Sequence, residues 1–252
     1  MSSENKNKVA AIIEARMGSS RLPGKVLADI CGVPALGRLI NRLKLCEHLD
    51  DIVIATSTST KDDELELWAK NNNLKCYRGS EDDVLQRVVD ASKSVNCDLI
   101  VEITGDCILT DYEVVDQSII MFLENNCDVV TNCGAYLSYP MGIYSQVFRS
   151  EDLQWVASNI NDPAVREHVS LYFYENTDKY NIINMVAPKS SSYPDWRLQL
   201  DYKEDLMLLI ELYKTLEPTY GNAFKLDHIC EALLANPKLL EINKHCIEKT
   251  TR

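Results

Sequence analysis

The segment from Ala15 to Lys25, A-R-M-G-S-S-R-L-P-G-K, gathers residue types that can hold a phosphate group. Glycine lets backbone N–H groups approach an oxyanion closely, and arginine and lysine add positive charge. The segment follows an apolar run and precedes a helical pattern, which is a common position for bound phosphates. The alternative is a surface turn with solvated charges, but three cations within ten residues of an acidic chain favour a binding role. The residues predicted to contact a nucleotide are Ala15, Arg16, Gly18, Ser19, Ser20, Arg21 and Lys25.

Two familiar phosphate-binding motifs are excluded by spacing. A Walker A loop places Gly-Lys four residues after its first glycine and follows the lysine with Ser or Thr. Here five residues separate Gly18 from Gly24, and Val26 follows Lys25, so no hydroxyl is in place to ligate magnesium. The G-x-G-x-x-G triplet of dinucleotide-binding folds does not occur. A metal bound near this loop must therefore take its protein ligands from elsewhere in the chain.

Two aspartates are candidates for that role because each stands at the end of a predicted strand. Asp106 follows a buried apolar run, and Asp201 ends an alternating one. Mg²⁺ prefers oxygen ligands at about 2.1 Å and is usually held by one or two carboxylates together with substrate phosphates. Asp is also a frequent helix N-cap. Asp106 could cap the helix expected from Asp111, and Asp201 the helix expected from Tyr202, so the residues alone leave both roles open.

The elements that must position these residues alternate between strand and helix in the first half of the chain, which is typical of a parallel sheet with helices on both faces. Ligands of such sheets bind beyond the carboxyl ends of the strands. The loop after the first strand and the segment around Asp106 should therefore share one edge. The expected strands are 9–14, 51–56, 74–77, 98–103 and 128–131, and the expected helices are 35–45, 61–72, 81–94 and 111–124.

The second half mixes both element types and shows no clear linker. We expect one α/β domain over residues 1–252, Rossmann-like with a mostly parallel sheet, carrying a small α+β insertion at about 134–195. Strands are expected at 143–148, 180–186 and 196–201, and helices at 150–159, 163–174, 206–216 and 226–234.

The net charge, the cysteine spacing and the length of the apolar runs exclude several classes of protein. The net charge of -12 argues against nucleic acid as the main partner, because phosphate backbones are bound by basic surfaces. The nine cysteines include no C-x-x-C pair, so we expect buried, reduced thiols rather than a zinc or redox site. No apolar run is long enough for a signal-peptide core or a membrane span. These features predict a cytoplasmic protein with no membrane partner.

At the level of motifs, the run Ala15 to Leu27 resembles the opening motif of the acylneuraminate and Kdo cytidylyltransferases, and most closely the spore coat polysaccharide biosynthesis protein F type. Further matching segments follow in order and cover most of the chain. They are R-G-S-E-D-D-V-L-Q-R at 78–87, I-T-G-D-C at 103–107, R-E-H at 166–168, L-D-Y-K-E-D-L at 200–206 and A-N-P-K-L-L-E-I-N at 235–243.

The resemblance implies a reaction in which CTP and an acidic sugar or related acceptor give a CMP-conjugate and pyrophosphate, for surface polysaccharide or glycoconjugate biosynthesis. It also implies a nucleotidyltransferase (GT-A-like) fold and a homodimer. By the same resemblance, Asp106 and Asp201 correspond to the family's two Mg²⁺ ligands. Lys25, Arg16 and Asp106 are then the expected catalytic residues, with the cations neutralising the triphosphate. No general base can be named.

Other residues are candidates for the acceptor side. Arg78 follows a strand and so points toward the ligand edge, where it could also bind the nucleotide. Arg87 and His168 lie in predicted helices, where a solvated cation and a structural histidine are the defaults. The candidates for binding the acceptor are Arg87, Tyr139, Gly142, Arg166 and His168.

The sequence departs from the family pattern at three places. Glu14 stands where many relatives carry Gln, which puts a carboxylate beside the anionic cradle or turns it toward the base or an arginine. Ile108 replaces a proline, and Tyr202-Lys203 replaces Thr-Pro. Two other functions are compatible with such a loop: a glycosyltransferase that uses a preformed nucleotide sugar, and a non-catalytic nucleotide-binding subunit. The first is disfavoured because the nearest D-x-D-like stretches, at 61–63 and 81–83, fall at predicted helix starts.

Overall fold

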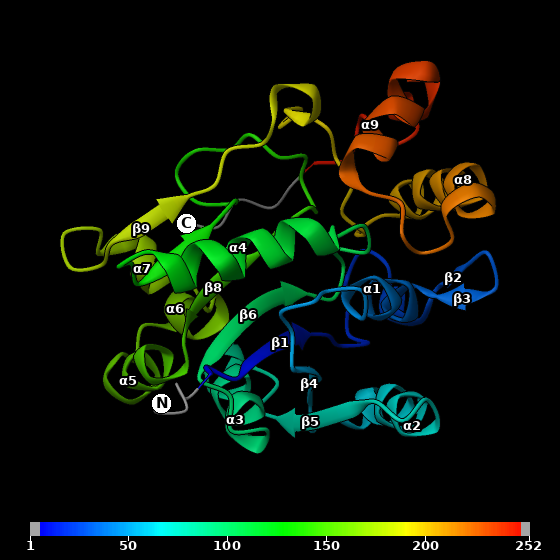
Figure 1. Cartoon of the computed structure of the whole chain (residues 1–252). Helices are drawn as coiled ribbons and strands as arrows, with labels where there is room; N and C mark the ends of the chain where they lie inside the picture. Colours follow the sequence, from blue (N-terminus) through cyan, green and yellow to red (C-terminus); the bar gives the residue numbers. More distant parts are fainter. Residues whose placement is uncertain (1–5, 248–252) are drawn as a thin grey trace.

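The computed structural model describes residues 6–247 and contains a seven-stranded sheet in the order β5-β4-β1-β6-β8-β7-β9 (Figure 1). The strands β5, β4, β1 and β6 run parallel, whereas β8 is antiparallel to both of its neighbours, β6 and β7. The predicted mostly parallel α/β sheet is confirmed. The strands are β1 (Val9–Glu14), β4 (Asp51–Ser57), β5 (Lys75–Gly79), β6 (Leu99–Thr104), β7 (Val129–Thr131), β8 (Gln146–Arg149) and β9 (Ile182–Asn184), with a separate hairpin of β2 (Asp29–Ile30) and β3 (Val33–Pro34).

Helices cover both faces of the sheet, and alternate residues of β1 show which helices belong to which face. Ala11 and Ile13 pack in one core cluster with side chains of α1, α2, α4, α8 and α9, whereas Ala10 and Ile12 pack in a second cluster with α3, α5, α6 and α7. The helices are α1 (Ala35–Leu43), α2 (Asp63–Asn71), α3 (Val84–Ser94), α4 (Tyr112–Glu124), α5 (Ser150–Asn159), α6 (Pro163–Glu167), α7 (Leu171–Glu175), α8 (Lys203–Tyr220) and α9 (Leu226–Ala235).

The structure corrects three of the expected elements. The helix expected over 81–94 begins at Val84, because the Asp83 carboxylate accepts the Gln86 N–H and caps it there. The helix expected over 163–174 is broken into α6 and α7 by an extended residue, His168. The segment 196–201 is not a strand of the sheet. Its backbone N–H groups donate to carbonyls of two different loops, at Met141 and Asp106, so it is extended without a continuous partner.

The prediction of buried, reduced cysteines is confirmed in part. All nine cysteines are free, and Cys97, Cys107, Cys127 and Cys230 are buried, but Cys31 is exposed. No helix among residues 6–247 is both long and apolar enough to cross a membrane. The portion 134–195 contributes β8 and β9 to the same sheet as the first half.

A buried arginine ties the C-terminal helices to the first half of the chain. Arg42 of α1 is fully buried, and its guanidinium donates to the carbonyls of Thr110 (2.9 Å), Asn222 (3.1 Å) and Phe224 (2.8 Å). It also lies 4.2 Å from the centre of the Phe224 ring. Burial lowers the pKa of Arg42, but no acceptor among its contacts is a carboxylate, so the interaction is hydrogen bonding to backbone rather than an ion pair.

We expect Arg42→Leu to lower the free energy of unfolding by about 3 kcal/mol or more, because it leaves several buried carbonyl oxygens without a donor. Urea denaturation followed by circular dichroism measures this. The exposed Lys44 provides the control, since Lys44→Leu should change stability by no more than about 0.5 kcal/mol. A loss below about 1 kcal/mol for Arg42→Leu would show that the carbonyls find other donors.

Candidate active site

A cavity of about 500 Å³ opens at the carboxyl ends of β1 and β6, where the sequence predicted the ligand edge. It brings together the loop after β1, the Asp106 segment, the start of α3 and the break between α6 and α7. Its lining includes Glu14, Ala15, Arg16, Gly18, Ser19, Ser20, Arg21, Lys25, Val84, Arg87, Thr104, Gly105, Asp106, Glu167, His168, Gln199 and Asp201.

The loop is held in shape by its own backbone and by one buried acid. The Met17 carbonyl accepts the N–H groups of Ser19 (2.9 Å) and Gly24 (3.0 Å), and the Met17 N–H donates to buried Asp62 at 2.7 Å. Gly24 adopts a left-handed backbone with φ 71°, which glycine tolerates without strain. A short 3-10 turn at Lys25–Leu27 follows, rather than an α-helix. The backbone that carries Arg16, Arg21 and Lys25 is therefore held in one conformation.

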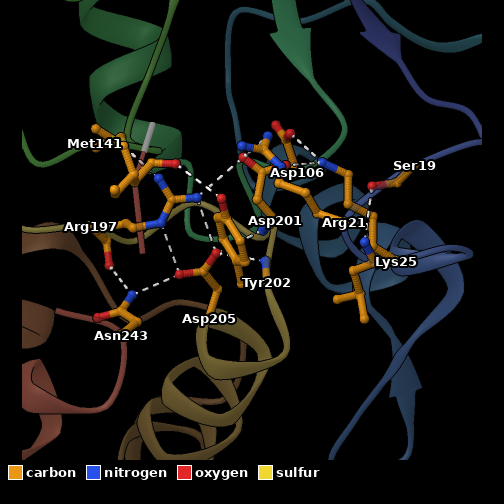
Figure 2. A network of polar contacts seen from close by, with 12 residues as sticks. Ser19, Arg21, Lys25, Asp106, Met141, Arg197, Asp201, Tyr202, Asp205 and Asn243 are labelled. Atoms are coloured by element: carbon orange, nitrogen blue, oxygen red, sulfur yellow. Dashed lines mark hydrogen bonds and ion pairs between the residues drawn. The ribbon is translucent and has the colours of Figure 1, made fainter. Parts of the chain in front are cut away.

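Lys25 joins the two predicted metal ligands (Figure 2). Its Nζ lies 2.6 Å from Asp106 Oδ2 and 2.7 Å from Asp201 Oδ1, and Arg21 pairs with the other Asp201 oxygen at 2.8 Å. Burial acts to lower the pKa of Lys25 and to raise that of Asp106. The mutual attraction of the charges outweighs burial in both, so the pKa of Lys25 is raised and that of Asp106 is lowered. Lys25 and Asp106 are therefore both charged at neutral pH.

The donor set at this point fits a magnesium ion. Carboxylate oxygens from Asp106 and Asp201 converge on one position, which the Lys25 ammonium occupies here. Hard oxygen ligands and a nearby phosphate site are what Mg²⁺ requires. Neither aspartate is a helix cap, because Asp111 caps α4 and Tyr202 is the N-cap residue of α8. Asp106 and Asp201 therefore do not act as N-caps of α4 and α8.

Asp201 is supported by a buried polar cluster that the sequence did not reveal (Figure 2). Arg197 pairs with Asp201 at 3.2 Å and with Asp205 at 3.0 Å. Asp205 also accepts the backbone N–H groups of Asp201 (2.9 Å) and Tyr202 (2.8 Å), and Asn243 donates to it at 2.8 Å. These contacts fix the backbone on either side of Asp201 and so orient its carboxylate.

The cavity contains most but not all of the predicted site residues. Arg87 and His168 lie in the lining, and Arg87 is buried rather than solvated. Arg78 instead pairs with Asp63 and Glu66 on α2. The remaining three lie outside the lining: Tyr139 is in the core, Gly142 (φ 92°) packs against the backbone at 198–199, and Arg166 donates to Asp83 and to the Ala157 carbonyl. None of these four residues lines the cavity.

A pair of acids, Glu14 and Glu102, is the least expected part of the site. The Glu14 carboxyl lies against that of Glu102, and the two share a hydrogen bond. Burial raises the pKa of Glu14 to about 7 and raises that of Glu102 well above its usual value. Glu14 was already noted as a departure from the family pattern, and for Glu102 the signal in the sequence is a lone acid in the apolar run L-I-V-E-I-T at 99–104.

The raised pKa of Glu14 predicts a pH-dependent stability. A carboxyl group whose pKa is higher in the folded state favours folding below its unfolded value of about 4.5, and this contribution is lost as pH rises through about 7. Glu14→Gln removes that loss. We expect the variant to gain stability over the native protein by up to about 3 kcal/mol between pH 5 and 8. Urea denaturation at several pH values tests this, and a difference independent of pH would contradict it.

Solved structures of two similar proteins show which class of fold this is. The fold matches a cytidylyltransferase from Leptospira borgpetersenii with a TM-score of 0.87 and 30% identity, covering 97% of this chain and all of that one. It also matches a CMP:2-keto-3-deoxy-manno-octonic acid synthetase solved with CTP, with a TM-score of 0.65 and 18% identity. The match covers 82% of this chain and 99% of that one. The fold is that of nucleotidyltransferases.

Similarity in sequence identifies the family of this chain. The family model described as cytidylyltransferase matches residues 10–239. The spore coat polysaccharide biosynthesis protein SpsF of Bacillus subtilis is 32% identical over 213 residues, which is 82% of this chain and 87% of that protein. The chain belongs to the cytidylyltransferase family and is a nucleotidyltransferase.

Proposed function

We propose that this protein transfers CMP from CTP to an acidic sugar or related acceptor and releases pyrophosphate, with Mg²⁺ as its cofactor. The observation that carries the proposal is the meeting of a cationic, glycine-bearing loop with two carboxylates, the partly buried Asp106 and the buried Asp201, in one cavity. The names of two similar proteins, one for spore coat polysaccharide biosynthesis and one for CMP:2-keto-3-deoxy-manno-octonic acid synthesis, support an acceptor used for surface polysaccharides or glycoconjugates.

In the proposed reaction, an acceptor oxygen attacks the α-phosphorus of CTP and pyrophosphate leaves. Arg16 is exposed at the cavity and makes no ion pair with any residue in 6–247, so its guanidinium is available to the triphosphate. Lys25 and Arg21 are held beside it by Asp106 and Asp201 and would neutralise phosphate charge. When bound by those aspartates, Mg²⁺ would polarise the phosphate and stabilise the leaving group.

The acceptor needs positioning more than activation if its nucleophile is already an oxyanion. His168 is the candidate for this side that the structure supports best. It leaves the helical path after α6 with φ −115° and ψ 96°, and it reaches the cavity lining beside Glu167. Arg87 is the other acceptor candidate in the lining.

The proposal is tested by measuring pyrophosphate release from each of CTP, UTP, ATP and GTP with Mg²⁺. The acceptor panel should contain sialic-type, Kdo-type and phosphorylated sugars. We expect release from CTP with at least one acidic acceptor and none without acceptor. Transfer of sugar from a preformed CMP-sugar, with no pyrophosphate from CTP, would favour a glycosyltransferase. Binding of CTP without turnover on any acceptor would favour a regulatory subunit.

We also propose that the active form is a homodimer. The portion 134–195 exposes large apolar side chains, among them Tyr136, Leu137 and Val186, which are 53–60% exposed. Apolar surface of this kind is often covered by a partner. Light scattering coupled to gel filtration should give twice the chain mass of 28.6 kDa, whereas a monomer at micromolar concentration would contradict the proposal.

A further inference from the structure

Three side chains with metal-binding atoms come together away from the cavity: Glu204 in the first turn of α8, and His245 and Cys246 near the end of the described chain. One carboxylate oxygen, one imidazole nitrogen and the thiol sulfur lie within 4.8 Å of one another. Among residues 6–247, no other group of three or more such side chains comes as close together. None of the three lines the cavity at β1 and β6.

The turn 243–246, which carries two of these side chains, is anchored on buried groups (Figure 2). The Cys246 N–H donates to the Asn243 carbonyl at 2.9 Å, which closes the turn. The amide of buried Asn243 donates to the Arg197 carbonyl at 2.9 Å and to the Asp205 carboxylate at 2.8 Å. Because Asp205 lies in the first turn of α8, the turn 243–246 and the helix are held together without an ion.

The spacing of the three ligand atoms is close to that of a tetrahedral zinc site. Zinc binds carboxylate oxygen and imidazole nitrogen at about 2.0–2.2 Å and thiolate sulfur at about 2.3 Å, so neighbouring ligand atoms are about 3.3–3.6 Å apart. Glu204 Oε1 and His245 Nε2 are already 3.7 Å apart. The side chains of His245 and Glu204 are 70% and 38% exposed, so both have room to close on the less exposed Cys246.

The charges around Cys246 favour a cation. Burial raises the pKa of its thiol, and the carboxylates of Asp205 and Glu204 raise it further, so the same two charges attract a metal ion. Arg197 acts in the opposite direction, but its guanidinium is paired with Asp201 and Asp205. A bound zinc ion replaces the thiol proton: the Zn–S bond forms as the S–H bond breaks, and the proton passes to solvent.

The mixture of ligand types decides which metal this site suits. Thiolate and imidazole suit zinc, whereas Mg²⁺ takes oxygen ligands. We propose that Glu204, His245 and Cys246 bind one Zn²⁺ ion, with a water molecule in the fourth position. The ion joins the segment 243–247 to the first turn of α8, and the inference is independent of the proposed function. The cysteine spacing did not indicate this site, because Glu204 is distant in sequence from the other two ligands.

Titration of the native protein with Co²⁺ tests the inference, because Co²⁺ enters zinc sites and a thiolate bound to it absorbs in the near ultraviolet by charge transfer. With the cysteines kept reduced, we expect this band to saturate at one equivalent of Co²⁺ and to disappear when Zn²⁺ is added in excess. Cys246→Ser should abolish the band. Glu204→Gln and His245→Ala should each weaken Co²⁺ binding at least about tenfold, a loss that follows even from removing groups that only orient a ligand.

Two further variants locate the ion. Cys31 is exposed and lies outside the cluster, so Cys31→Ser should keep the band. Asp106→Asn should keep it as well, which separates this ion from one held in the cavity. Circular dichroism checks that each variant is folded. Absence of the band in the native protein, its persistence in Cys246→Ser, or its loss in folded Cys31→Ser or Asp106→Asn would overturn the inference.

Discussion

Asp106→Asn should reduce pyrophosphate release from CTP by about a thousandfold or more, which corresponds to roughly 4 kcal/mol of transition-state stabilisation. The asparagine has the same shape, so the fold and the Lys25 contact at 2.6 Å can persist. What is lost is one of the two negative charges that would hold Mg²⁺ beside the triphosphate. Single-turnover measurement of pyrophosphate at saturating CTP isolates the chemical step.

Two controls make this result interpretable. The exposed Asp178 offers the same substitution away from the cavity, and Asp178→Asn should retain native turnover. Thermal unfolding should show Asp106→Asn folded near the native melting temperature. Turnover within a few-fold of native in folded Asp106→Asn would remove Asp106 from the metal site, whatever the result for the control.

Lys25→Met is the second large effect, and it should change two measurements in opposite directions. In the free protein the Lys25 ammonium neutralises Asp106 and Asp201, so a metal ion must displace it to reach both carboxylates. Removing the ammonium leaves the carboxylates of the partly buried Asp106 and the buried Asp201 close together, and a divalent cation relieves their repulsion. We expect Mn²⁺ to bind the variant without nucleotide at least about tenfold more tightly than it binds the native protein.

Turnover by Lys25→Met should nevertheless fall by about a hundredfold or more, because a cation aimed at the triphosphate is lost. Mn²⁺ affinity is measured by calorimetry or by paramagnetic relaxation, and turnover by pyrophosphate release. Lys44→Met, at an exposed position, should alter neither. If Mn²⁺ affinity stays unchanged or falls in folded Lys25→Met, the lysine does not compete with metal for these carboxylates.

The parts of the site that were predictable from sequence lie within continuous segments. The loop 16–25 and Asp106 each follow an apolar run, and parallel strands bring the ends of such runs to one edge. Asp201 was predicted on its resemblance to a motif. The buried cluster of Arg197, Asp205 and Asn243 was not, because Asn243 lies 38 to 46 positions from its two partners and no local pattern encodes those contacts.

The errors have physical causes of the same kind. Apolar periodicity predicted one helix over 163–174, but His168 leaves the helix to reach the cavity. Arg78 was predicted to contact a ligand because it follows a strand, but its guanidinium forms ion pairs with Asp63 and Glu66 of α2. Glu102 was visible as an acid in an apolar strand. Its partner Glu14 lies on the neighbouring strand, and the order of strands in a sheet cannot be derived from either run alone.

The central claim is that this protein moves a nucleoside monophosphate from CTP to an acceptor. Incubation with CTP labelled with ³²P at the α-phosphate, Mg²⁺ and an acidic sugar acceptor tests it most directly. The account predicts that the label appears in a CMP-conjugate of the acceptor while the released pyrophosphate is unlabelled, and that Asp106→Asn abolishes both products. Label that remains in CTP with every acceptor of the panel, or that leaves in a diphosphate, would contradict the account.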